Sequence, residues 1–98
     1  MNQDLKHEIE KVIGGYREVK EALLFGSRAL GNAKPSSDVD VALKGEIDLR
    51  LLAAISDELN ETSNLPVFFD LVDYHGIKNR ALKEHIDRYG QMLYRRES

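Results

Sequence analysis

Three aspartates have the residue type and the spacing of a metal site. Asp38 and Asp40 stand two residues apart in a segment, residues 38–43, that alternates polar and apolar side chains. This alternation is the period of a strand, so both carboxylates are expected on one face, with Cα atoms roughly 6–7 Å apart. Two carboxylates this close repel each other unless a cation lies between them. Hard cations such as Mg²⁺ or Mn²⁺ prefer oxygen ligands, so the pair predicts a divalent metal site.

Asp70 is the third candidate, because it lies inside the apolar run 67–72. An ionised carboxylate is costly to bury there without a partner. The segment between residues 48 and 62 predicts a helix, and a helical crossover favours parallel pairing of the strands on either side of it. Asp70 would then join Asp38 and Asp40. Three such carboxylates can hold two metal ions about 3.5–4 Å apart, which suits in-line phosphoryl chemistry.

A phosphate cradle is predicted at Gly26 and Ser27, where a short apolar strand ends. Glycine allows a phosphate to approach the backbone closely, and the amides at the start of a helical turn favour anions. The Ser27 hydroxyl adds a donor, and it is also a plausible N-cap. If the first two strands are antiparallel, Gly26 and Asp38 lie at the same end of the sheet. Arg28 and Lys34, on the following loop, either bind triphosphate or are simply solvated.

The elements that must position these residues follow from periodicity. Three helices are expected, each with an apolar face directed inward. The inward residues of the N-terminal helix are Leu5, Ile9, Val12, Ile13 and Tyr16. Those of the second helix are Leu49, Leu52, Ile55, Ser56 and Leu59, and those of the third are Leu82, Ile86 and Tyr89. Asp48 is a good N-cap for the second. The pattern indicates a single α/β domain, residues 1–98, of the α+β type: a small mixed sheet flanked by helices. The expected elements are helix 4–16, strand 22–25, a short turn and loop 27–37, strand 38–43, helix 48–62, strand 67–72, helix 77–89 and an edge strand 91–94.

Two strings of the sequence resemble the polymerase-β-like nucleotidyltransferase superfamily. Gly26-Ser27, ten residues and then Asp38-Val39-Asp40, with a later strand carboxylate, is similar to its signature. The fuller string from Phe25 to Gly31, continued from Ser37 to Val41, resembles the minimal branch, and so does the closing segment 86–94. One departure is Leu30, where many relatives carry a second arginine; it affects phosphate or partner contacts and leaves the carboxylates intact.

The resemblance implies an enzyme that uses Mg²⁺ or Mn²⁺ to transfer a nucleoside monophosphate, AMP from ATP, onto an acceptor hydroxyl. Asp38, Asp40 and Asp70 would be the catalytic and metal residues, and Gly26, Ser27 and Arg28 would bind the NTP. The acceptor implied is a tyrosine of a small helical protein of the HEPN type, a toxin for which this chain would be the antitoxin. A homo- or hetero-oligomer is compatible with this expectation.

Composition narrows the alternatives. The 98 residues suffice for one domain, and the net charge of -3 argues against stable polynucleotide binding. The absence of cysteine excludes disulfides, Cys-type zinc sites and thiol catalysis. No apolar run approaches a membrane span and the N-terminus is polar, so a cytoplasmic protein is expected.

Other interpretations stay open from the residues alone. One alternative is a non-catalytic module that neutralises its partner by contact, and another is a transferase for a small molecule such as an antibiotic. Asp38 can be a turn residue, Gly26 a strand terminator, and Asp70 a structural carboxylate paired with an arginine. His7, His75 and His85 share no metal-ligand spacing and are interpreted as surface residues, with none expected to activate Ser27 as a nucleophile.

Overall fold

Four strands form one mixed sheet in the computed structural model, which describes residues 3–35 and 37–97. The strands are β1 (Val19–Phe25), β2 (Val39–Gly45), β3 (Phe69–Asp73) and β4 (Gln91–Arg95), and their order in the sheet is β3-β2-β1-β4. β1 is antiparallel to both β2 and β4, whereas β2 and β3 are parallel. The mixed sheet, the antiparallel first pair and the edge strand at the C-terminus are all confirmed.

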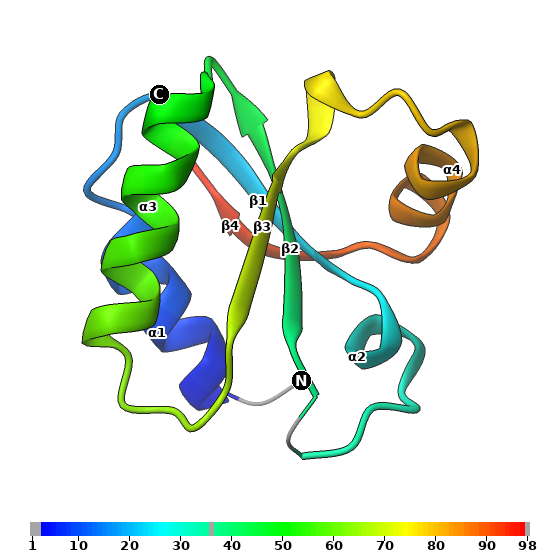
Figure 1. Cartoon of the computed structure of the whole chain (residues 1–98), viewed down its shortest axis with the longest axis horizontal. Coiled ribbons are helices and arrows are strands. Elements are labelled where there is room, and N and C mark those ends of the chain that lie inside the picture. Colours follow the sequence, from blue (N-terminus) through cyan, green and yellow to red (C-terminus); the bar gives the residue numbers. More distant parts are fainter. Residues whose placement is uncertain (1–2, 36, 98) are drawn as a thin grey trace.

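Two long helices, α1 (Gln3–Ile13) and α3 (Leu49–Thr62), pack together against one face of the sheet (Figure 1). The main core lies between them and the strands, and it contains Ile9 and Ile13 of α1, Ile55 and Leu59 of α3, and Val39, Val41 and Leu43 of β2. The alternation of β2 therefore buries its valines on this face, as predicted. Within the described residues, none of the helices is both long and apolar enough to cross a membrane.

The opposite face of the sheet is only partly covered. Helix α4 (Arg80–Tyr89) packs there through Ile86 against Phe25 of β1 and Ala42 of β2. The short helix α2 (Ser27–Leu30) follows β1 directly (Figure 1), and the 3-10 turn η1 (Tyr74–Gly76) follows β3. Asp40 precedes Ala42 by two residues on β2 and so points to this less covered face.

Several expected boundaries and inward positions need correction. α1 ends at Ile13, before the two glycines, and α4 begins at Arg80 rather than residue 77 because the Asn79 side chain accepts from the Leu82 amide. Leu49 is 84% exposed, so it does not belong to the inner stripe, and Leu51 and Leu52 of the same turn pack on the core instead. Tyr89 is also mostly outside, at 45% exposure. The Asp48 cap is confirmed: its Oδ1 accepts from the Leu51 amide at 2.7 Å.

Asn60 of α3 fixes the start of β3. Its amide nitrogen donates to the Phe69 carbonyl at 3.0 Å, and its Oδ1 accepts from the Phe69 amide at 2.8 Å. This pair of bonds replaces the strand neighbour that β3 lacks on its outer edge. Because Phe69 is fully buried and Asp70 is next in the chain, Asn60 sets the position of Asp70 indirectly.

Replacing Asn60 by alanine should therefore destabilise the fold. Both main-chain groups of Phe69 lose their partner, and the expected loss is about 1–3 kcal/mol of unfolding free energy. Urea denaturation measures it, with Asn64→Ala, at an exposed position outside α3, as the matched control. Equal midpoints for the two variants would contradict the anchoring role.

Candidate active site

Asp40 and Asp70 are direct neighbours across the parallel ladder of β2 and β3. Paired residues on adjacent strands have backbones roughly 5 Å apart and side chains on the same face. Asp38 lies one residue before β2, so the predicted strand began one residue too early, but Asp38 stays within electrostatic range of Asp40. The three aspartates singled out by sequence are thus brought together at one end of the sheet.

Burial raises the pKa of the Asp40 carboxyl, and the negative charges of Asp70 and Asp38 raise it further, while His85 opposes them. A pKa above that of the unfolded chain means that ionised Asp40 opposes folding. The folded state therefore gains stability as the pH falls through the raised pKa toward the ordinary aspartate value, and loses it as the pH rises. At neutral pH the site concentrates negative charge at a cost to the fold.

A divalent cation is the kind of group that would relieve this repulsion. The donor set consists of carboxylate oxygens, which suits Mg²⁺. As their side chains lie, no three Asp, Glu, His or Cys residues within the described part of the chain are gathered tightly enough to hold a metal. The fit is therefore one of charge and donor chemistry, carried by the paired register of Asp40 and Asp70.

Asp70 differs from expectation in one respect, since it is exposed rather than buried. β3 is an edge strand whose site face is left open, so the predicted desolvation cost does not arise. No ion pair among the described residues involves Asp70. The alternative of a structural aspartate neutralised by an arginine therefore has no support in this structure.

Gly26 lies directly against Asp40. Its backbone has φ 76° and ψ -154°, a conformation that residues with a Cβ rarely adopt. A Cβ built at this position would overlap Asp40 Oδ2. Glycine is therefore required twice at the turn, by its backbone conformation and by the space that the carboxylate occupies.

Ser27 is the first residue of α2, next to this contact. The N-cap of α2 is Gly26, and no side chain caps the helix, so Ser27 is not the N-cap. The first amides of a helix have no acceptor within it. Phe25 pairs with Asp40 in the antiparallel ladder of β1 and β2. Ser27 follows Phe25 by two residues, so its donor groups lie at the end of the sheet where the carboxylates lie.

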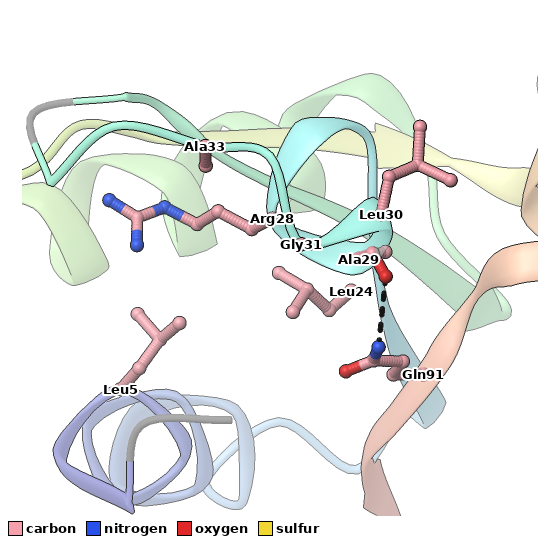
Figure 2. Close-up of a pocket in the computed structure, with 8 residues that line it drawn as sticks. All are labelled: Leu5, Leu24, Arg28, Ala29, Leu30, Gly31, Ala33 and Gln91. Atoms are coloured by element: carbon pink, nitrogen blue, oxygen red, sulfur yellow. Dashed lines mark hydrogen bonds between the residues drawn. The ribbon is translucent and has the colours of Figure 1, made fainter.

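Arg28 points elsewhere. Its guanidinium donates to the Ser37 carbonyl at 2.8 and 3.3 Å and to the Pro35 carbonyl at 3.0 Å, so it clamps the loop that leads to Asp38. Figure 2 shows Arg28 extended above Leu5 of α1, at the wall of a pocket of about 390 Å³. This pocket lies between α1, α2 and β4, and the aspartates do not line it. Lys34 is exposed on the same loop.

His85 is the residue that sequence analysis missed. It is half-buried rather than a surface residue, and its Nε2 accepts the amide hydrogen of Gly26 at 2.9 Å. The helical period of this segment indicates that position, because residues 82, 85, 86 and 89 share one face of the helix. Metal-ligand spacing, the pattern by which the histidines were judged, carries no information on that periodicity. His7 and His75 are exposed, as expected.

Comparison with known proteins identifies the family. The family described as polymerase beta, nucleotidyltransferase, matches residues 7–98. The chain belongs to this family. It is a nucleotidyltransferase by membership, with the small mixed sheet and flanking helices of the polymerase-β-like fold. No curated protein matches the chain significantly.

Chains from two solved toxin–antitoxin complexes, and one protein assigned as a minimal nucleotidyltransferase, have a similar fold. A chain of a toxin–antitoxin complex with AMP-PNP superposes with a TM-score of 0.74 at 21% identity, over 94% of this chain and 74% of that chain. A chain of the complex of tri-AMPylated Shewanella oneidensis HEPN toxin with MNT antitoxin has a TM-score of 0.72 at 21% identity, over 98% and 74%. A protein assigned as a minimal nucleotidyltransferase has a TM-score of 0.69 at 26% identity, over 89% and 90%.

Proposed function

We propose that this nucleotidyltransferase transfers AMP from ATP to a tyrosine hydroxyl of a HEPN-type partner and thereby acts as an antitoxin. The observation that carries the proposal is the pairing of Asp40 with Asp70 beside the glycine turn at Gly26. The carboxylates would bind the metal and the turn would bind phosphate, side by side at one open end of the sheet. A cytoplasmic location, where ATP and Mg²⁺ are abundant, belongs to the same proposal.

The three aspartates would hold the metal. Asp38 comes from the residue before β2, Asp40 comes from β2 itself, and Asp70 completes the set from the adjacent strand. Bound there, Mg²⁺ or Mn²⁺ would neutralise triphosphate charge and orient the α-phosphate. The raised pKa of Asp40 supports this assignment, and so does the lack of an ion pair to Asp70 among residues 3–35 and 37–97.

Phosphate binding would fall to the Gly26–Ser27 turn, and proton transfer would fall to Asp70 on the edge strand β3. Ser27 would donate to the phosphates, while Gly26 leaves them room. The acceptor oxygen attacks the α-phosphorus, the bond to the β-phosphate oxygen breaks, and pyrophosphate leaves with the electron pair. Asp70, exposed on the open side, would take the proton of the acceptor hydroxyl. For Arg28 we propose a role in holding the loop before Asp38 in place of direct contact with the nucleotide.

The acceptor is proposed from the relatives. One is a complex with AMP-PNP, and another contains a HEPN toxin that carries three AMP groups. The superposition covers about three quarters of each of those chains, so most of their length has a counterpart in this chain. A HEPN partner and ATP are therefore preferred over a small-molecule acceptor.

Nucleotide binding gives the first test. A ligand that binds only the folded state stabilises it, so Mg²⁺ with ATP should raise the melting temperature of the purified protein, and a hundredfold excess over Kd adds about 2.7 kcal/mol. ATP with a metal chelator should give a much smaller shift. Equal shifts with and without metal would remove the metal from the proposal.

The partner then separates the three candidate functions. Co-expressed partner is incubated with the protein, ATP and Mg²⁺, and its intact mass is measured. A mass increase of one or more AMP groups, mapped to tyrosine, supports the proposal. A partner that is neutralised without any mass change would favour the contact module, and AMP transfer only to small hydroxyl compounds would favour the antibiotic-type enzyme.

A further inference from the structure

The contact between His85 and Gly26 joins two elements that are 59 residues apart in the sequence. Imidazole Nε2 accepts from the Gly26 amide, so the ring hydrogen is assigned to Nδ1. Two aromatic rings orient the imidazole: Phe25 meets it edge-on with centroids 6.1 Å apart, and Tyr89 lies 5.4 Å away. The acceptor nitrogen therefore faces the turn in a packed setting.

The glycine turn is held by two helices, because α2 binds the Gly26 carbonyl and α4 binds the Gly26 amide through His85. The Gly26 carbonyl already accepts from the amides of Ala29 and Leu30 in α2. With its amide bonded to His85, both polar groups of Gly26 are occupied, and the glycine is held between α2, α4 and the Asp40 carboxylate. The Gly26 amide is then not a phosphate donor, and that role passes to the neighbouring Ser27.

We infer that His85 is a positioning residue of the nucleotide site, which acts through Gly26 to hold Ser27 at a fixed place beside Asp40. The inference rests on the proposed function, because it assigns ATP to this turn. Helix α4, which packs on the same face of the sheet as Asp40, thus determines how well the phosphate donors and the carboxylates are aligned. A turn without this bond keeps its glycine but samples other backbone conformations, so ATP binding weakens.

Two substitutions distinguish the role of the His85 hydrogen-bond acceptor from the role of its ring packing. His85→Phe keeps a ring between Phe25 and Tyr89 but removes the acceptor, whereas the carbonyl oxygen of His85→Gln can accept from Gly26 again. The expected result is a rise of KM for ATP of about tenfold in His85→Phe, the equivalent of one hydrogen bond, with kcat changed much less. His85→Gln should recover most of that loss. His7→Phe, at an exposed position of α1, is the matched control.

Amide hydrogen exchange measured by NMR provides a readout that does not depend on catalysis. The Gly26 amide should be protected in the wild type and in His85→Gln, and should exchange faster in His85→Phe, while the melting temperatures stay similar. An unchanged or lower KM in His85→Phe would overturn the inference, because it would mean that the free Gly26 amide serves ATP at least as well. Unchanged Gly26 exchange would overturn it too.

The two proposals fail in different ways. If the wild-type protein bound no ATP, the proposed function would fail, and the role of His85 in nucleotide binding would fail with it. Protection of the Gly26 amide by His85 would then identify the contact as purely structural. If the wild type bound and transferred AMP normally but His85→Phe had no effect on KM, only the inference would fail.

Discussion

A variant carrying both Asp38→Asn and Asp40→Asn should fold normally and yet lose nucleotidyl transfer. Metal-held charge neutralisation is worth several kcal/mol in the transition state, so the rate should fall about a thousandfold or more. Stability should hold or rise, because burial and neighbouring charges raise the pKa of Asp40 and its ionised form opposes folding. The transfer rate is measured with Mg²⁺ and ATP, and the melting temperature is measured on the metal-free protein.

The same variant separates chemistry from contact in cells. A contact antitoxin needs only its interface, so it would still protect cells that express the partner. The enzyme requires the carboxylates, and we expect no protection at moderate expression. Asp57→Asn, an exposed aspartate of α3 outside the site, is the control that should behave as wild type. Full protection by the double variant, with an unmodified partner, would contradict catalysis as the mechanism of neutralisation.

Gly26→Ala should cost both stability and nucleotide binding. The positive φ of Gly26 costs a residue with a Cβ about 1–3 kcal/mol, and the new methyl group would overlap Asp40 Oδ2. The carboxylate is the end of a flexible side chain, so the overlap is relieved mainly by moving it. That movement displaces a proposed metal ligand, and ATP affinity should fall beyond the loss in stability.

Gly31→Ala separates these two costs. Gly31, the C-cap of α2, also has a positive φ of 80°, but a Cβ there would meet nothing within 4 Å. Both variants should lower the denaturation midpoint, whereas only Gly26→Ala should weaken binding of Mg²⁺–ATP in a calorimetric titration. Equal affinity in the two variants would show that the glycine turn does not adjoin the nucleotide.

Much of the site was predictable because it depends on short-range rules. The spacing of Asp38 and Asp40 predicted a shared face, and the helix capped by Asp48 predicted a parallel crossover that brings in Asp70. Both rules are local consequences of strand period and of connection handedness. Neither rule depends on which elements cover the two faces of the sheet.

Other features depend on which face is covered, and no local pattern encodes that. Asp70 was expected to be buried because its neighbours are apolar, but β3 is an edge strand and its site face is open. Leu49 continues a helical stripe and is nevertheless exposed. For Arg28 the residues alone left triphosphate binding and a solvated side chain open, and the structure shows a third contact, with the loop carbonyls of Pro35 and Ser37.

Radiolabelled ATP tests the central claim most directly. The protein and its partner are incubated with Mg²⁺ and ATP labelled at either the α- or the γ-phosphate, and label on the partner is counted after denaturing separation. Nucleotidyl transfer predicts label from α-labelled ATP and none from γ-labelled ATP, with both absent for the double aspartate variant. Label from γ-labelled ATP, or equal labelling by wild type and variant, would contradict AMP transfer by these carboxylates.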